Sequence, residues 1–300
     1  MALETEAGME TVDVCMLCGS EDFRTAFEEP PYSVRRCERC GMGWASPRFS
    51  EEQLQAIYKS DNYWRSPSPK VQGYTDYRGD ERLYLDTFRR RLKFVLADGP
   101  RSGRSLDVGC AAGFCMAVMR ELGFEAHGLE ISETIASHAR ERFGFDTIHL
   151  GKLDSAPYPD GHFDVITMWD VVEHVVDPVE LLVKARELLR PGGLLVIETQ
   201  DIDSRFARSL GPRWHHYKHE EHIYHFTPPT VRTLLSRAGF DVVKLTHRYG
   251  GKYVSTHFIA ERASRLHPVL TKLLSPLTAF DQARLYLNFM DEMIVLARPR

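Results

Sequence analysis

An apolar strand pattern that ends in two glycines and leads into a helix pattern constrains the fold more than any other feature of the sequence. The segment reads Leu106-Asp107-Val108-Gly109-Cys110-Ala111-Ala112-Gly113-Phe114. From Ser105 onward, short apolar runs alternate with helical patterns, as they do in a parallel sheet that is covered by helices on both faces. We therefore expect an α/β fold with a doubly wound, mostly parallel sheet.

Apolar runs and capping residues place the individual elements. Seven strands are expected, at 105–108, 126–129, 147–150, 163–168, 194–198, 240–245 and 293–297. Helices are expected at 50–63, at 80–97, from the cap Ser132 to 143, from the cap Asp177 to 191, and from the cap Thr227 to 239. An apolar helical insertion is predicted at about 253–286, where it forms a lid, an oligomer surface or part of the core.

Four of the six cysteines form two C-x-x-C pairs, Cys15/Cys18 and Cys37/Cys40, with eighteen residues between the pairs. Thiolates at the tips of two tight turns can form a tetrahedral cage of four sulfurs, which is typical of structural Zn²⁺ sites in a reducing compartment. We therefore predict a small N-terminal zinc ribbon at 1–48. Cys110 and Cys115 lie within the glycine segment and are interpreted as small packing residues.

Composition and charge narrow the range of partners. The chain has 38 Lys+Arg and 42 Asp+Glu, a net charge of −4, so a polyanion such as nucleic acid is not expected as the main partner. No apolar stretch approaches the roughly 18 residues that a membrane helix needs. The N-terminus is acidic, unlike a signal peptide. We expect a cytoplasmic protein without membrane contact, and monomer and homodimer both remain open.

Two carboxylates near the glycine turn discriminate between cofactors. The turn alone would suit the pyrophosphate of NAD or FAD equally well. Asp107 would repel a pyrophosphate, yet it suits a ligand that carries an ammonium group and a sulfonium cation. Glu130, at the tip of the next strand, either accepts hydrogen bonds from ribose hydroxyls or caps the helix at Ser132. Leu153 and Asp154 are expected beside the adenine ring.

Residues 105–245 resemble the class I S-adenosylmethionine-dependent methyltransferases, in particular the ubiquinone-biosynthesis-type O-methyltransferases. The likeness rests on 107–113, 128–132, Phe163-Asp164-Val165-Ile166 and Glu173-His174-Val175. It implies a Rossmann-like fold that binds S-adenosylmethionine through Asp107, Gly109, Cys110, Ala111, Gly113, Phe114, Glu130, Ile131, Leu153, Asp154 and Trp169. The common family loop has glycine where this chain has Ala111, which makes the loop bulkier.

The front of the chain resembles a zinc-ribbon extension found on some bacterial methyltransferases that modify sugars or natural products. The likeness rests on Tyr32, on Cys37-x-x-Cys40-Gly41 and on Pro47-Arg48. The expected organisation is therefore the ribbon at 1–48, a helical linker or cap at 49–100 and the methyltransferase domain at 101–300. The ribbon either contributes to the recognition of the substrate or only stabilises the fold.

Two polar clusters are candidates for the chemistry. The first contains Asp170, Glu173 and His174 after the fourth strand, at the sheet edge where ligands bind in this architecture. The second is a histidine-rich run that includes His219 and His222, unless that run is only a solvated surface loop. Either a histidine acts as a general base, or a divalent ion binds Asp170, Glu173, His174 and His222. The metal set resembles an E-x-x-E-H pattern in which Asp170 replaces the first glutamate.

The leading functional prediction is O-methylation of a small-molecule acceptor, such as a sugar, a glycosylated natural product or a phenol, in a biosynthetic pathway. Methylation of nitrogen or carbon remains an alternative. A nucleic-acid methyltransferase is weighed as a second class, and the acidic balance and the absence of basic-aromatic stripes argue against it. A binding module without turnover is the third class, which the retained Glu173-His174 pair argues against.

Overall fold

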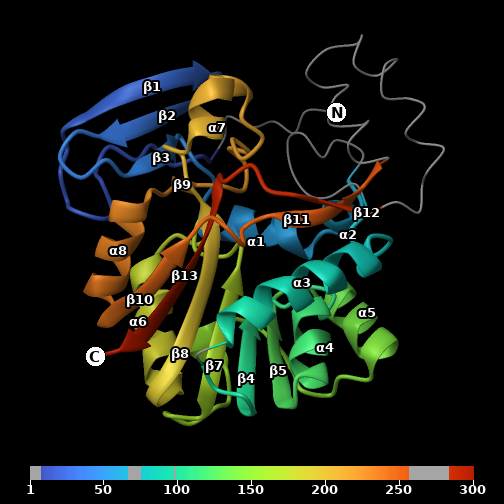
Figure 1. The fold of residues 1–300 in the computed structure, drawn as a ribbon. Helices are drawn as coiled ribbons and strands as arrows, with labels where there is room; N and C mark the ends of the chain where they lie inside the picture. Colours follow the sequence, from blue (N-terminus) through green and yellow to red (C-terminus); the bar gives the residue numbers. More distant parts are fainter. Residues whose placement is uncertain (1–7, 67–75, 98, 257–283) are drawn as a thin grey trace.

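Seven strands form the central sheet of the structure, a computed structural model that describes residues 8–66, 76–97, 99–256 and 284–300 (Figure 1). They are β4 (Gly103–Val108), β5 (Phe124–Glu130), β6 (Ile148–Leu150), β7 (Phe163–Trp169), β8 (Leu189–Gln200), β10 (Phe240–Thr246) and β13 (Glu292–Pro299). Their order is β10-β13-β8-β7-β4-β5-β6. Only β13 runs antiparallel to its neighbours within this described sheet. The predicted mostly parallel, seven-stranded sheet is confirmed.

Helices cover both faces of this sheet, and each face has its own apolar core. One face carries α3 (Glu81–Val95), α4 (Phe114–Glu121) and α5 (Glu133–Phe143), and the other carries α6 (Pro178–Leu188) and α8 (Pro228–Arg237) (Figure 1). Successive residues of a strand point to opposite faces, so Val165 packs in the core beneath α4 and Ile166 in the core beneath α6. Because both faces are covered, the strands read as continuous apolar runs.

The predicted helix caps are formed at Asp177 and Thr227 but not at Ser132. The Asp177 carboxylate accepts a hydrogen bond from the Glu180 amide at 2.9 Å, and Thr227 forms a capping box with Thr230. Ser132 makes no side-chain cap, because its hydroxyl instead accepts a hydrogen bond from Trp64 Nε1 at 3.2 Å. The start of α5 is therefore held by another group, which is described below.

Helix α6 ends earlier than its terminal Pro-Gly-Gly signal predicts. The last helical residue is Leu188, and Leu189 already pairs with Phe163 in the sheet. The Pro-Gly-Gly sequence at 191–193 consequently lies within the first part of β8. The predicted helix boundary at Pro191 is wrong because strand pairing takes over three residues sooner.

A four-stranded antiparallel sheet forms the N-terminal ribbon. It contains β1 (Phe23–Glu29), β2 (Tyr32–Cys37) and β3 (Gly43–Ser46), and its fourth strand is β9 (Tyr224–His225), which comes from the histidine-rich run (Figure 1). Strand β3 pairs with β9 through Gly43 opposite His225 and Trp44 opposite Tyr224. The ribbon sheet is thus completed by a segment that lies about 180 residues later in the chain.

Side-chain contacts add to this junction between the ribbon and the rest of the chain. The Arg48 guanidinium donates to the Tyr224 hydroxyl at 2.8 Å, and both side chains are buried. Arg237, on α8, donates to the carbonyl oxygen of Leu17 at 2.6 Å, beside the first cysteine pair. The ribbon therefore contacts the rest of the chain at two places, along strand β3 and next to the first cysteine pair.

The remaining elements surround the end of the sheet at which the parallel strands terminate. They are α1 (Glu51–Lys59), α2 (Asp61–Trp64), η1 (Leu153–Ser155), α7 (Arg205–Leu210), η2 (Gly211–Arg213), β11 (Lys252–Ser255) and β12 (Arg284–Leu287). The predicted helical insertion is wrong at its ends, where Tyr253 and Tyr286 face each other in the β11–β12 pair. Its central part, 257–283, lies outside the described residues. None of the described helices is long and apolar enough to cross a bilayer.

Candidate active site

The turn between β4 and α4 requires a left-handed backbone at three positions. Gly109, Ala111 and Gly113 have φ angles of 72°, 46° and 75°. A side chain on Gly113 would also approach the Ala139 Cβ to 3.1 Å, so glycine is needed there for space as well. Ala111 tolerates the left-handed conformation at a cost of about 1–2 kcal/mol. The strained alanine is compensated by a hydrogen bond of its own amide, described next.

Glu130 connects this turn to the start of α5. Its carboxylate accepts hydrogen bonds from the backbone amides of Ala111 at 2.9 Å, Ile131 at 2.8 Å and Ser132 at 2.9 Å. A carboxylate has about four acceptor positions, so one remains for a ligand hydroxyl. Burial raises the pKa of Glu130, and the three amides oppose that rise. The side chain therefore serves the local turn, and the predicted contact with ribose remains a prediction.

Asp107 lies on β4, buried between the glycine turn and the neighbouring strand. Its carboxylate accepts a hydrogen bond from Thr167 Oγ1, on β7, at 2.6 Å. Burial raises the pKa of Asp107 to about 7; hydrogen bonds from Thr167 and Cys115 oppose the rise, and the Glu130 charge adds to it. The free protein thus holds a poorly stabilised carboxylate at this position, which a cationic ligand would stabilise.

The other predicted cofactor residues are distributed around this turn. Cys110, Phe114 and Leu153 are buried, Ile131 is half-buried, and Asp154 is exposed on η1. Trp169, at the end of β7, donates its indole N–H to the Cys115 sulfur at 3.1 Å. Ile131 also lines a small hollow of about 220 Å³ beside Leu150 and Gly151, at the ends of β5 and β6. These residues surround the edge of the sheet at which β4, β5 and β7 end.

Aromatic residues from the segment before α3 lie over the same turn, and the sequence analysis did not identify them. The Tyr77 ring stacks on Phe114, with 5.5 Å between the ring centroids. Burial raises the pKa of Tyr77 well above its usual value, and the nearby charges of Tyr84, Asp107, Asp170 and Glu130 add to the rise. The sequence signal was weak, because Tyr77 stands in a polar stretch between the helices expected at 50–63 and 80–97.

The segment after β7 contains a strained backbone position and buried carboxylate oxygens without hydrogen-bond partners among the described residues. Asp170 has a φ of 53°, which is uncommon outside glycine and is often found at functional sites. Its Oδ1 and the Oε1 of Glu173 are buried without a hydrogen-bond partner among the described residues. Glu173 Oε2 accepts from Thr199 Oγ1 at 3.1 Å. Burial and the Asp170 charge raise the pKa of Glu173 well above its usual value.

His174 and His222 meet beside Glu173. Their rings lie 4.6 Å apart at an angle of 88°, and ligand atoms of all three side chains lie within 4.8 Å of one another. Asp170 is outside this set, so three of the four predicted metal ligands come together. Two backbone amides of the histidine-rich run, those of Ile223 and Tyr224, donate to the Glu173 carbonyl at 3.0 and 3.2 Å. These bonds dock the second cluster onto the first.

Both histidines are held in the neutral form. Burial lowers the pKa of His174, although the charges of Glu221 and Asp170 raise it. Burial and the neighbouring His174 and His216 hold the pKa of His222 well below its usual value. His174 Nδ1 lies 2.8 Å from both the Glu221 carbonyl oxygen and the Tyr58 hydroxyl, which fixes the ring. Neutral imidazoles can accept a proton or bind a metal.

His219 does not join this group, contrary to the prediction. Its ring packs 5.4 Å from that of Tyr32, on β2, and its Nε2 lies 3.3 Å from the Glu29 carboxylate. Burial lowers its pKa, and Glu29 opposes that shift. The loop directs His219 toward the ribbon and His222 toward Glu173, so only the latter belongs to the candidate site.

The four ribbon cysteines fit a metal ion. The Sγ atoms of Cys15 and Cys40 lie 3.5 Å apart, as do those of Cys18 and Cys37, and all four lie within 4.8 Å of one another. Sulfurs bound to Zn²⁺ at about 2.3 Å are separated by similar distances. Burial raises the pKa of the Cys37 thiol, but hydrogen bonds from backbone amides and the Cys18 thiol stabilise its thiolate. The net result is a pKa lowered to about 7. Cys110 and Cys115 are buried packing residues.

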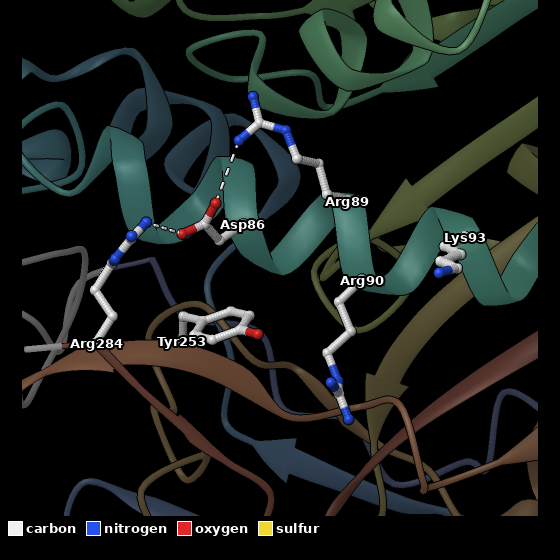
Figure 2. Close-up of a pocket in the computed structure, with 6 residues that line it drawn as sticks. All are labelled: Asp86, Arg89, Arg90, Lys93, Tyr253 and Arg284. Carbon is white, nitrogen blue, oxygen red and sulfur yellow. Dashed lines mark hydrogen bonds and ion pairs between the residues drawn. The ribbon is translucent and has the colours of Figure 1, made fainter.

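A hollow of about 520 Å³ lies elsewhere, on the outer side of α3 (Figure 2). Its lining residues are Asp86, Arg89, Arg90, Lys93, Tyr253 and Arg284. Figure 2 shows that Asp86 pairs with both Arg89 and Arg284, so part of the positive charge is neutralised within the wall. The buried side of α3 carries Phe88 and Leu92, which face the sheet. This hollow is therefore separate from the candidate active site.

Comparison with known proteins agrees with this geometry. Residues 78–245, more than half of the chain, match the model of the methyltransferase domain family. A ubiquinone biosynthesis O-methyltransferase of Ruegeria sp. is 32% identical over 167 residues, which are 52% of this chain and 66% of the relative. A probable S-adenosylmethionine-dependent methyltransferase of Mycolicibacterium smegmatis is 25% identical over 186 residues, 58% of this chain and 70% of the relative.

Solved structures show the same fold at low sequence identity. A SAM-dependent methyltransferase from Thermotoga maritima, described as a possible histamine N-methyltransferase, has a TM-score of 0.51 and 18% identity, covering 84% of this chain and 100% of its own. Magnesium protoporphyrin IX methyltransferase from Synechocystis, with bound SAH, has a TM-score of 0.52 and 14% identity, with the same coverage. The chain spans 61–66% of the length of the first curated O-methyltransferases that it matches.

Proposed function

The chain belongs to the methyltransferase domain family, and from this premise we propose that it transfers a methyl group from S-adenosylmethionine to a hydroxyl group of a small molecule. A sugar, a glycosylated natural product or a phenol would suit as the acceptor. The observation that carries the proposal is the pair of buried carboxylates, Asp107 and Glu130, on the two sides of the glycine turn. A cationic nucleoside suits this pair, whereas a dinucleotide phosphate would be repelled.

The cofactor would lie across the ends of β4, β5 and β7. When bound, it supplies a methyl carbon activated by positively charged sulfur. Asp107 offers its charge to the cationic end, and Glu130 has one acceptor position left for a ribose hydroxyl. The adenine would lie near Ile131, Leu153 and Asp154. The remaining predicted contacts, Gly109, Cys110, Ala111, Gly113, Phe114 and Trp169, surround the turn.

His222, or else His174, would take the proton from the acceptor hydroxyl. His222 is the stronger candidate, because burial disfavours its charged form and its Nδ1 makes no hydrogen bond to the described residues. His174 is already engaged by Glu221 and Tyr58, which suits a positioning role. The alternative is a divalent ion bound by Glu173, His174 and His222, which would acidify the hydroxyl. Undiminished turnover after chelation, with the ribbon zinc retained, would exclude that alternative.

Cofactor affinity is expected to rise with pH through about 7. A cation binds best to the ionised form of Asp107, whose pKa burial raises to about 7. Protonation below that pH should weaken binding by up to roughly tenfold per pH unit. Calorimetric titration of S-adenosylmethionine at pH 6 and pH 7.5 measures the effect. Asp107→Asn should bind weakly at both pH values, and a wild-type affinity that does not change with pH would contradict the placement of the cation at Asp107.

The ribbon is proposed to hold one structural zinc through Cys15, Cys18, Cys37 and Cys40, in a unit that extends over 1–48. The helical segment at 49–100 is proposed as a cap over the cofactor turn, because Trp64 and Tyr77 contact residues at that turn. The methyltransferase domain proper would occupy 101–300.

The proposed function is tested with methyl-labelled S-adenosylmethionine and pairs of acceptors that differ by one hydroxyl group. The labelled methyl group should be transferred to a hydroxylated sugar or phenol. It should not be transferred to the second acceptor of the pair, in which that hydroxyl is already methylated. Mass spectrometry of the product distinguishes a methyl group on oxygen from one on nitrogen or carbon. Calorimetry that detects a nicotinamide dinucleotide, and neither the sulfonium donor nor its demethylated product, would overturn the proposal.

A further inference from the structure

We propose that His215, His216 and Asp291 form a second metal site, which binds a late first-row divalent cation such as Zn²⁺. The two histidines follow η2, and Asp291 immediately precedes β13. One ligand atom from each of the three residues lies within 4.8 Å of the other two. The site shares no residue with the ribbon cysteines or with the Glu173, His174 and His222 group.

The distances fit an ion that draws the ligands slightly together. Nε2 of His215 lies 4.0 Å from Asp291 Oδ2, and Nε2 of His216 lies 3.9 Å from the same oxygen. Ligands that bind a tetrahedral Zn²⁺ at about 2.0–2.1 Å are roughly 3.3 Å apart. Each side chain therefore needs to move by only a fraction of an ångström, which rotation about its own bonds provides.

The buried Nε2 of His216 lies close to the Asp291 carboxylate. His216 is only 6% exposed, and its Nε2 forms no hydrogen bond with the described residues. Glu292 Oε1 lies 3.3 Å from this nitrogen without hydrogen-bond geometry, and it accepts a hydrogen bond from Lys252 at 2.8 Å. Buried polar atoms are rarely left without a partner in folded proteins. A metal ion would satisfy the His216 nitrogen from the side of Asp291.

A further contact orients the carboxylate, and the site has an entry path. Trp214 Nε1 donates to Asp291 Oδ2 at 2.8 Å, as second-layer donors commonly do for carboxylates that bind metals. Trp214 itself is buried, so this hydrogen bond is shielded from water. The His215 side chain is 30% exposed, which leaves a route for the ion and for a water molecule as a further ligand.

The donor set selects the class of metal. Two imidazoles and one carboxylate favour Zn²⁺, Ni²⁺ or Co²⁺ over Mg²⁺ and Ca²⁺, which prefer oxygen ligands. The ion would tie the histidine-rich loop to the start of β13. The His216 ring stacks on that of His222, 5.8 Å away, so the loop held by the ion is the same loop that delivers His222 to Glu173. A salt bridge between protonated His216 and the two carboxylates is the competing explanation.

Cobalt binding to the complete protein tests the proposal. With zinc retained in the ribbon, we expect one equivalent of Co²⁺ to bind and to give a visible spectrum without the thiolate charge-transfer absorption of a cysteine site. His215→Ala and Asp291→Asn should each weaken the binding by at least about tenfold. Glu173→Gln, in the other histidine and carboxylate group, is the matched control and should bind Co²⁺ like the wild type.

Two results would overturn the proposal. One is the absence of Co²⁺ binding beyond the ribbon, which would leave the salt bridge as the explanation. The other is binding that is lost in Glu173→Gln and retained in His215→Ala, which would place the ion at the other group. If Asp291→Asn fails to fold, Co²⁺ binding to His215→Ala still tests the proposal, because the His215 side chain is partly exposed. The spectrum does not depend on methyl transfer, so the outcome is independent of the proposed function.

Discussion

Replacing His222 with alanine is expected to lower kcat by about 100- to 10,000-fold, the usual contribution of a general base. His222 is buried, it is held neutral by its surroundings, and it lies beside Glu173 and His174 where the second cluster docks on the first. Affinity for S-adenosylmethionine should change by no more than about twofold, because the proposed cofactor contacts come from other loops. Steady-state kinetics and calorimetry on the same preparation separate the two effects.

His162→Ala is the matched control for this prediction. His162 precedes β7, at the opposite end of the strand from Asp170, and it contacts Arg104 and not the candidate site. The control should retain wild-type kcat. If His222→Ala lowers kcat by less than about tenfold while its fold and cofactor affinity are intact, the assignment of His222 as the base is wrong. His174→Ala would then become the variant of interest.

Replacing Cys37 with serine is expected to release the ribbon metal and to lower kcat by roughly 100-fold. A structural zinc supplies about 10–16 kcal/mol of binding free energy to the fold of a small ribbon, so losing one thiolate should unfold it. Strand β9 then loses its partner β3, and His222, two residues before β9, loses its fixed position. A misplacement of about 1 Å can cost roughly 100-fold in rate.

Zinc content, hydrogen exchange and kinetics test this chain of effects. Exchange should accelerate at the backbone amides of 223–226. Affinity for the cofactor should persist, because the described hydrogen bonds of Asp107 and Glu130 go to residues outside the ribbon. Glu38→Gln changes an exposed residue between Cys37 and Cys40, and this control should keep both the zinc and the activity. A Cys37→Ser protein that has lost zinc and retains full kcat would contradict the proposed link between the ribbon and the site.

Much of the central sheet could be predicted because its signals are local. Each predicted strand overlaps an observed one, since a strand buried on both faces leaves a continuous apolar run such as that of β7. Strand β9 left no comparable signal. It has two residues, and its partner β3 lies about 180 residues earlier, so only the tertiary fold creates it. The end of α6 was misplaced for a related reason, because pairing of Leu189 with Phe163 overrides the local helix signal.

The candidate site was predictable where its residues follow strand ends. Asp107, Glu130, Glu173 and His174 stand at or just after the ends of parallel strands, and these ends meet at one edge of a sheet. His219 and His222 lie in an irregular loop, where no periodicity indicates which side chain faces inward. Tyr77 and Tyr58 come from the segment that packs over the turn, and their positions depend on long-range packing. No sequence pattern encodes such contacts.

The pairing of β3 with β9 limits how this protein can be recombined with its relatives. A graft that exchanges residues 1–48 alone would replace one strand of the pair and keep the other, leaving Trp44 and Arg48 of one parent against Tyr224 of another. Chimeras that also carry the segment around 222–226 keep both sides of the junction together. Functional hybrids should therefore arise from two simultaneous crossovers, far apart in the gene, and rarely from one.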